Sequence, residues 1–300
     1  MKENKILQED ILPIHQLIEK VLGNVVIKSI HRLGGLTNHS YKVELDNQQI
    51  FVVRLPGEGT SEMINRNDEK VSTELANRLG IDSQLLYFGA DGAKVSEYIE
   101  DAITLNAEKL REVNTIKDVA KIFSTLHNCG EDTHVPFEVF DMAKGYEDII
   151  YAHNVKMYDD YEEIKNIVMN IKNKVDRDSE IKKVPCHNDS LCENWIYGGS
   201  KLYLIDWEYA GMNDGMWDLA DISIEADYNE EQDAILLYEY LGKEPSLIEK
   251  QRFIANKLYL DYLWTLWGKT RVPYDGDVME EYALNRYLRL KSNISKFDEK

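Results

Sequence analysis

Cysteine is scarce in this chain of 300 residues, which contains only Cys129, Cys186 and Cys192. An odd number of cysteines without a regular spacing argues against a disulfide framework and indicates reduced thiols in a cytoplasmic protein. Cys186, His187 and Cys192 lie close together, but no second Cys/His pair completes the ligand spacing of a structural zinc site. We therefore expect neither disulfide bonds nor a zinc ion.

Long apolar segments and a basic charge balance are also missing. No apolar run reaches the roughly 18 residues of a transmembrane helix, and the charged start MKENKILQEDILP lacks the apolar core of a signal peptide. Lys and Arg number 35 against 54 Asp and Glu, which gives a net charge of −19. The missing apolar run predicts no membrane span. Because such an acidic chain repels polyanions, we also expect no nucleic-acid partner. Nothing in these numbers indicates an oligomeric state.

The first third of the chain is rich in strand-forming residues. Short runs of β-branched and aromatic side chains are separated by glycine, asparagine and aspartate turns, which predicts strands over 25–33, 39–45, 50–55, 85–88 and 94–99. Apolar residues every four positions predict a helix over 66–79, just before Gly80. These elements make a small lobe with a five-stranded antiparallel sheet and one main helix.

The remainder of the chain is mostly helical by its pattern. Apolar stripes of helical period predict helices near 116–126, 164–171, 230–241, 246–267 and 277–294, and two short strands are predicted within 195–205. Strand character gives way to helix near 97–103. We therefore predict an α+β, two-lobed fold, with an N-lobe of residues 1–98 and a larger, mostly helical C-lobe of residues 99–300.

One segment has the spacing of a catalytic loop. His187, Asp189 and Asn194 form the pattern H-x-D-x-x-x-x-N, in which protein kinases use the Asp on the acceptor hydroxyl and the Asn on a metal ion. Asp206 follows at the end of the apolar run Leu202–Ile205, where a kinase places its second metal ligand. We predict Asp189, Asn194 and Asp206 as catalytic residues, with Asn194 and Asp206 holding Mg²⁺. The alternative is that Asp189 and Asn194 only cap the loop and Asp206 only ends a strand.

A glycine turn between the first two predicted strands is a candidate phosphate-binding loop. It contains Gly34, Gly35, Leu36, Thr37 and Asn38, and such a turn can present backbone N–H groups and a hydroxyl to phosphates. By itself a Gly-Gly pair is more often a plain turn. No Walker A motif is present, because the tail Gly268-Lys269-Thr270 lacks the earlier glycine that the motif requires.

Arg54 ends the third predicted strand, where a kinase carries the cation that pairs with the nucleotide phosphates. An arginine can hold phosphates through its planar fork. In kinases a glutamate of the following helix fixes this cation, and Glu69 is a better candidate than Glu74. The alternative for either glutamate is a solvent-facing helix position.

Together these segments resemble the choline/ethanolamine kinases, within the larger group that includes aminoglycoside phosphotransferases. The resemblance runs from Leu33 to the C-terminal helix and is strongest to bacterial choline kinases that supply phosphocholine to surface polysaccharides. The sequences that carry it are GGLTN at 34–38, VRL around Arg54, CHND at 186–189, LIDWEY at 204–209 and WTLW at 264–267. Choline kinases similarly carry Arg at the Arg54 position. The resemblance implies Mg-ATP as the donor, with adenine near Tyr98 and Ile99; we read His127 as structural.

Choline is the acceptor that the aromatic residues favour. A quaternary ammonium has no N–H donors and binds aromatic faces through cation–π contacts. Trp264 and Trp267 share one helix face, and the resemblance implies that Tyr209 and Tyr282 add further walls to a choline pocket. The alternative is that these aromatics are plain core. Acidic residues such as Asp218 and Glu225 are expected at the surface, where they can add long-range attraction for a cation.

Other readings stay open at this point. The acceptor could instead be ethanolamine, thiamine or an aminoglycoside. Ethanolamine keeps three N–H donors and would favour a pocket with carboxylates, and an aminoglycoside needs many acidic contacts. A catalytically inactive nucleotide- or choline-binding module is a different class, but it does not require Asp189, Asn194 and Asp206 together.

Overall fold

The computed structural model describes residues 6–34, 38–57 and 64–298. The chain divides into two compact units, one made of residues 1–105 and 193–210 and the other of residues 106–192 and 211–300. The assignment of function to an N-lobe of residues 1–98 and a C-lobe of residues 99–300 stays a prediction.

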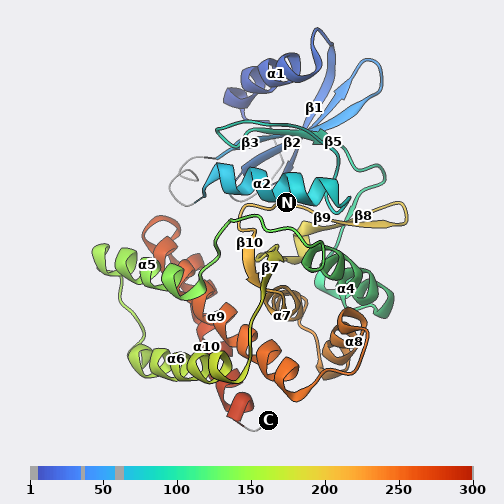
Figure 1. The fold of residues 1–300 in the computed structure, drawn as a ribbon. Helices are drawn as coiled ribbons and strands as arrows, with labels where there is room; N and C mark the ends of the chain where they lie inside the picture. Colours follow the sequence, from blue (N-terminus) through green and yellow to red (C-terminus); the bar gives the residue numbers. More distant parts are fainter. Residues whose placement is uncertain (1–5, 35–37, 58–63, 299–300) are drawn as a thin grey trace. The chain divides into compact units, whose positions relative to one another are not determined.

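The first unit contains the expected antiparallel sheet, whose strand order is β1-β2-β3-β5-β4 (Figure 1). The strands are β1 (Ile27–Gly34), β2 (Asn38–Leu45), β3 (Ile50–Pro56), β4 (Leu85–Phe88) and β5 (Lys94–Glu97). Helix α2 (Arg66–Arg78) follows β3, and Asn65 caps its start by accepting a hydrogen bond from the Asn67 N–H (3.0 Å). The five-stranded antiparallel sheet and helix α2 confirm these predicted elements, but a second long helix in this unit means that the expectation of one main helix is wrong.

Helix α1 (Gln8–Leu22) is an element that the sequence pattern did not indicate. Ile14, Leu17 and Ile18 lie on one face of this helix and join the apolar core formed by the sheet, including Tyr41 and Val53. The buried carboxylate of Asp10 is satisfied there, because it accepts hydrogen bonds from Tyr41 and His39. The N-terminal segment therefore belongs to the core of the first unit.

A second, smaller sheet of the first unit carries part of the candidate site. Strands β6 (Ile103–Thr104), β8 (Trp195–Gly198) and β9 (Lys201–Leu204) form it in the order β6-β8-β9. The predicted strand pair at 195–205 is thus an antiparallel hairpin, with Gly199 in the left-handed region of its turn (φ 60°). The hairpin brings the residues before β8 beside those after β9.

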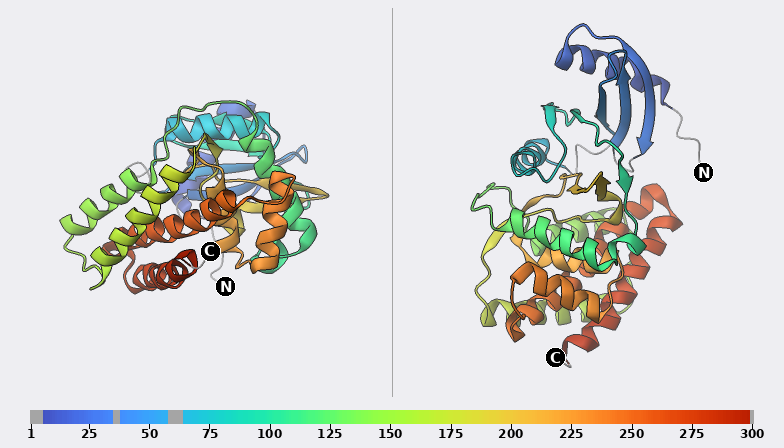
Figure 2. Two further views of the ribbon diagram at one scale, coloured as in Figure 1. Left: turned by 60° about the horizontal axis from the view of Figure 1, so that its bottom comes forward. Right: turned by 90° about the vertical axis from the view of Figure 1, so that its right-hand side faces the viewer.

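The second unit is mostly helical, as predicted. Its elements are α3 (Ala107–Leu110), α4 (Val113–His127), α5 (Val139–Ala152), α6 (Tyr161–Asp178), α7 (Met216–Glu225), α8 (Glu230–Leu241), α9 (Leu247–Asp275) and α10 (Asp277–Asp298), with a β7 (Lys183–Cys186) and β10 (Gly211–Asp214) strand pair. The long α9 contacts α5, α6, α7 and α10, and α9 and α10 lie side by side (Figure 2). Among the described residues, no helix combines the length and the apolarity that crossing a bilayer requires.

Helices α5 and α7 have no counterpart in the sequence prediction. Every residue of α7 from Met216 to Ile224 is buried, including its acidic side chains. A helix that is buried all round shows no polar stripe, so the usual helical period is lost from its sequence.

Replacing Ile18 by Ala tests whether α1 is part of the core. Ile18 is 1% exposed against the sheet, so we expect the free energy of unfolding to fall by about 2–5 kcal/mol. Leu12 lies on the same helix but is 64% exposed, and its replacement by Ala should cost less than about 0.5 kcal/mol. Urea denaturation of both variants measures the difference, and equal small effects would show that α1 does not pack on the sheet in solution.

Candidate active site

Glu69 is the centre of a buried charge cluster in the first unit. It lies in the first turn of α2, and its two carboxylate oxygens pair with Arg54 Nη2 (2.5 Å) and Arg66 Nη1 (2.6 Å). Both arginines are buried, so one carboxylate neutralises part of two desolvated cations. Glu74, by contrast, is only half-buried, and its ion pair with Lys70 is long at 3.8 Å. The pair expected between Arg54 and Glu69 is therefore present.

Arg66 extends this cluster toward Asn38 and Glu208. Arg66 Nη2 donates to the side-chain oxygen of Asn38 (3.2 Å), and the Asn38 amide donates to Glu208 (2.9 Å). Burial, followed by the charge of Asp206, raises the pKa of Glu208 to about 7. No sequence signal marks Arg66 as part of a site, since its partners come from distant segments of the chain.

The guanidinium of Arg54 keeps some hydrogen-bonding capacity. Its Nη2 also donates to the Gly92 carbonyl (2.9 Å), and its Nη1 lies 3.5 Å from Asp206. The Nε atom is buried and has no hydrogen-bond partner among the described residues. Burial alone would lower the Arg54 pKa, but Glu69 and Asp206 outweigh it and raise the pKa, so the cation stays charged. A fixed cation of this kind fits the phosphates of a nucleotide.

Asn194 and Asp206 are neighbours because the β8–β9 hairpin brings them together. Trp195 pairs with Leu204, and one step further the Ile205 N–H donates to the Asn194 carbonyl (3.0 Å). The Asp206 side chain is 35% exposed, and its backbone is left-handed (φ 68°), a conformation that clusters at functional sites. An amide oxygen and a carboxylate are ligands of the type that Mg²⁺ prefers, so this donor set fits the metal.

The predicted phosphate loop is described only at its two ends. Gly34 is the last residue of β1, and Asn38 is the first residue of β2, where its side chain bridges Arg66 and Glu208. Gly35, Leu36 and Thr37 lie outside the described residues, so their part in phosphate binding stays a prediction.

Tyr98 and Ile99 directly follow β5, at the end of the large sheet. The Tyr98 N–H donates to the Ile50 carbonyl (3.2 Å), and the Tyr98 ring lies under Lys42 Nζ (4.3 Å to the centroid). Ile99 packs on Gly198 so closely that a Cβ added there would lie 2.2 Å from Ile99 Cγ2. Their role in binding adenine stays a prediction.

In the second unit, the backbone of the predicted catalytic loop is held by Asp218. This buried carboxylate of α7 accepts hydrogen bonds from the backbone N–H groups of His187 and Asn188, both at 2.8 Å. Asn188 is left-handed (φ 67°), and the half-buried Asp189 follows it. The loop is thus anchored through its backbone, and the catalytic role of Asp189 stays a prediction.

Asp218, Asp221 and Glu225 lie on one face of α7, at spacings of three and four residues. Asp221 accepts hydrogen bonds from the backbone and the hydroxyl of Ser190, next to Asp189 in the sequence. Burial, followed by the charge of Glu225, raises the Asp221 pKa. The expectation that Asp218 and Glu225 lie at the surface is wrong: Asp218 is fully buried, and the largely buried Glu225 pairs with Arg286.

His127, Cys186 and Asp218 form a buried group whose potential ligand atoms lie within 4.8 Å of one another. Hydrogen bonds already engage it, because His127 contacts Asp218 (3.0 Å) and the Tyr240 hydroxyl (2.9 Å). Burial, followed by the charge of Asp218, raises the pKa of the Cys186 thiol, which disfavours the thiolate that a metal needs. This group supports the loop, and His127 is structural as expected.

The aromatic residues of α9 and α10 form a continuous group. Trp264 and Trp267 meet edge to face (centroids 6.1 Å apart), and Trp267 meets Tyr282 in the same way (5.7 Å). Gly268 allows this contact, since a Cβ at that position would lie 2.8 Å from Tyr282 Cδ1. The predicted pocket residues of the second unit are therefore together.

Electrostatic coupling relates Asp189 to two tyrosines of the same unit. Burial, followed by the Asp189 charge, raises the pKa of Tyr146 to about 12. The Tyr282 pKa is also raised, by burial first, and the Asp189 charge contributes. Tyr146 of α5 carries no motif and was not predicted. Tyr209 belongs to the first unit and remains a predicted pocket wall.

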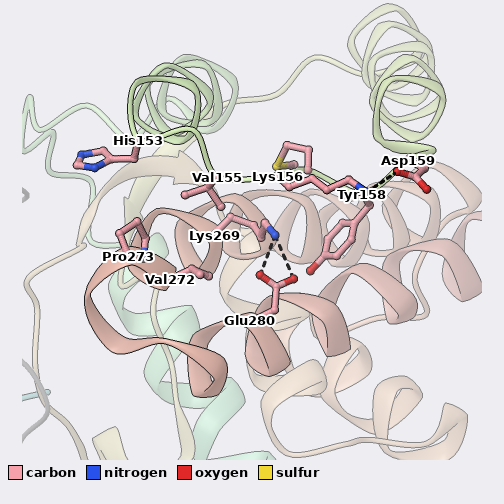
Figure 3. A pocket seen from close by; sticks show the side chains of 10 residues that line it. His153, Val155, Lys156, Tyr158, Asp159, Lys269, Val272, Pro273 and Glu280 are labelled. Atoms are coloured by element: carbon pink, nitrogen blue, oxygen red, sulfur yellow. Dashed lines mark hydrogen bonds and ion pairs between the residues drawn. The ribbon is translucent and has the colours of Figure 1, made fainter.

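A pocket of about 570 Å³ is lined by the segment after α5, the end of α9 and the start of α10 (Figure 3). Lys269, 3% exposed, pairs with Glu280 there (2.8 Å) and lies over the Tyr158 ring. The Gly268-Lys269-Thr270 sequence thus has a structural explanation, and none of the predicted acceptor residues lines this pocket.

The chain is similar in sequence and in structure to known kinases. A family model described as choline/ethanolamine kinase matches residues 29–272. Protein LicA of Haemophilus influenzae is 29% identical over 263 residues, covering 85% of this chain and 76% of LicA. The crystal structure of choline kinase LicA from Streptococcus pneumoniae matches with a TM-score of 0.81 and 31% identity, covering 95% of this chain and 98% of that one. A LicA structure in complex with AMP matches with a TM-score of 0.78 and 30% identity, covering 95% and 98%.

Replacing Glu69 by Ala should remove the counter-ion of two buried arginines. We expect a loss of about 3–5 kcal/mol in the free energy of unfolding, because uncompensated buried charges are costly. Glu74→Ala, on the same helix, removes only a long, half-exposed ion pair and should cost less than about 0.5 kcal/mol. Urea denaturation gives both values, and an equal, small effect of the two substitutions would contradict a structural role for Glu69.

Proposed function

The chain belongs to the choline/ethanolamine kinase family and is an ATP-dependent phosphotransferase of protein-kinase-like fold, and on this basis we propose that its acceptor is choline. The observation that carries the proposal is the contact of Trp264, Trp267 and Tyr282 in one group, with the Asp189 charge acting on Tyr282. The reaction would transfer the γ-phosphate of Mg-ATP to the choline hydroxyl and release ADP and phosphocholine.

The chemistry of the pocket favours choline over ethanolamine. A quaternary ammonium has no hydrogen to donate and gains about 0.5–2 kcal/mol from an aromatic face. A primary ammonium has three N–H donors and needs acceptors such as carboxylates. Glu225 interacts with Tyr282, but its carboxylate is already paired with Arg286 at 2.6 Å. The relative described as a choline kinase agrees with this preference.

Each predicted site residue takes a distinct role in the proposal. Asp189 accepts a hydrogen bond from the choline hydroxyl and orients it for in-line attack. Arg54, fixed by Glu69, binds phosphate oxygens together with the loop at 34–38. Asn194 and Asp206 would hold Mg²⁺, which supplies charge neutralisation on the phosphates when bound. Tyr98 and Ile99 would contact adenine, and Tyr209 would complete the walls of the choline pocket.

Replacing Asp189 by Asn tests the assignment of the catalytic carboxylate. The backbone of the loop is held by Asp218 and Asp221, so the fold and ADP binding should be retained. We expect kcat to fall by about 100-fold or more, because the hydroxyl loses its proton acceptor. Steady-state ADP release gives kcat and calorimetric titration gives the ADP affinity. A variant with near-normal kcat would remove Asp189 from the mechanism.

The acceptor is tested by ADP release from Mg-ATP with choline, ethanolamine and kanamycin in parallel. We expect kcat/KM for choline to exceed that for ethanolamine by about tenfold or more, which corresponds to one additional cation–π contact of about 1.4 kcal/mol. A preference for ethanolamine would keep the kinase chemistry and reject the aromatic pocket. Measurable ADP binding without turnover of any acceptor would favour an inactive binding module.

A further inference from the structure

Arg286 of α10 is a buried cation beside the proposed acceptor pocket. Its side chain is 7% exposed and pairs with Glu225 (2.6 Å). Its guanidinium also lies over the ring of Tyr282, with 5.0 Å from Cζ to the ring centroid. One side chain therefore contacts both an aromatic wall of the proposed pocket and an acidic group that interacts with that wall.

The arrangement follows from the spacing of residues on two helices. Tyr282, Arg286 and Arg289 lie on one face of α10, four and three residues apart, so Arg286 reaches back over Tyr282. Arg289 holds Asp261 through hydrogen bonds of 2.6–3.1 Å, whereas Arg286 lies 3.8 Å from Asp261. The strong partner of Arg286 is therefore Glu225, the last residue of α7.

The charge state of this pair matters for the acceptor. Burial alone would lower the Arg286 pKa, but Glu225 and the other neighbours raise it, so the guanidinium stays charged and neutralises the carboxylate. A neutralised carboxylate offers little to the N–H donors of a primary ammonium. A bare, partly desolvated carboxylate beside Tyr282 would instead bind such donors strongly.

We propose that Arg286 is a specificity-determining positioning residue, which pairs with Glu225 and packs on Tyr282 so that the pocket recognises a quaternary ammonium through aromatic faces rather than a primary ammonium through a carboxylate. The inference rests on the proposed function, since it requires the acceptor to bind at Trp264, Trp267 and Tyr282. Arg286 itself touches neither the hydroxyl that reacts nor the phosphates in this proposal.

The test compares choline and ethanolamine in Arg286→Met, which keeps an unbranched apolar side chain and removes the charge. We expect the ratio of kcat/KM for choline to that for ethanolamine to fall by about tenfold or more, mainly through KM, because Glu225 becomes available to N–H donors. The matched control is Lys291→Met, which removes a cation of the same helix whose partner is the partly exposed Asp160, away from Glu225, Asp261 and Tyr282. This control should leave the ratio within about twofold of the wild type, as expected for a residue that does not touch the pocket.

Two further variants keep the test decisive if Arg286→Met does not fold. The double variant Arg286→Met with Glu225→Gln removes both charges together, so no buried charge is left unpaired and the preference for choline should return. Glu225→Gln alone leaves a bare guanidinium behind Tyr282, and we expect it to raise KM for both ammonium substrates. A double variant with no preference for choline, or a Glu225→Gln variant with unchanged KM, would overturn the inference.

The failure of this inference can be distinguished from the failure of the proposed function. A wild-type protein that prefers ethanolamine, or uses neither acceptor, rejects the proposed function before any variant is made. A wild-type protein that prefers choline, combined with an Arg286→Met variant that loses the same factor on both acceptors, rejects only the specificity role. The ratio of the two acceptors is the decisive readout because a merely structural loss lowers both activities alike.

Discussion

The hydrogen bonds and ion pairs made by the acidic face of α7 are the interactions on which the predicted catalytic loop of the second unit depends. Asp218 accepts hydrogen bonds from two backbone N–H groups of this loop, Asp221 accepts hydrogen bonds from the backbone N–H and the hydroxyl of Ser190, and Glu225 pairs with Arg286. A buried carboxylate is tolerated only where donors or cations compensate its lost hydration. The loop conformation and the buried acids of α7 therefore depend on each other, because without the N–H donors of the loop the carboxylates of Asp218 and Asp221 would be uncompensated.

The same constraint shapes the first unit with a different set of residues. Glu69 is shared by Arg54 and Arg66, and Arg66 reaches Glu208 through the Asn38 amide. Fixing Arg54 on two sides limits the conformational entropy that it would lose on binding a phosphate. The cost is that removing Glu69 would leave two buried arginines without their shared counter-ion. Both units thus hold predicted site residues through buried networks rather than through surface contacts.

What the sequence predicts here is what local pattern can encode. The five strands, α2, most of the longer helices and the pairing of Arg54 with Glu69 follow from periodicity and motif spacing, and the hairpin at 195–205 explains why Asn194 and Asp206 are neighbours. Helix α7 could not be predicted, because it is buried all round and its acids look like surface residues. The roles of Arg66 and Arg286 depend on contacts with residues that are distant in the chain, and a local sequence pattern does not predict such contacts.

In the proposal, the preference between choline and ethanolamine depends on which cation pairs with Glu225, the guanidinium of Arg286 or the ammonium of the substrate. If an internal guanidinium pairs with Glu225, the ammonium of the substrate gains nothing from hydrogen bonds there and must be held by aromatic faces, which suits three methyl groups. If the substrate supplied the cation, its N–H donors would take the place of Arg286, and methyl groups would leave the carboxylate desolvated and unpaired. Asp221 lies between Glu225 and the catalytic loop on α7, so the preference can change at Arg286 while the contacts that hold Ser190 and Asp189 persist. In this proposal, different residues of one α7 face support the two functions: Asp218 and Asp221 hold the loop that carries Asp189, and Glu225 holds Arg286.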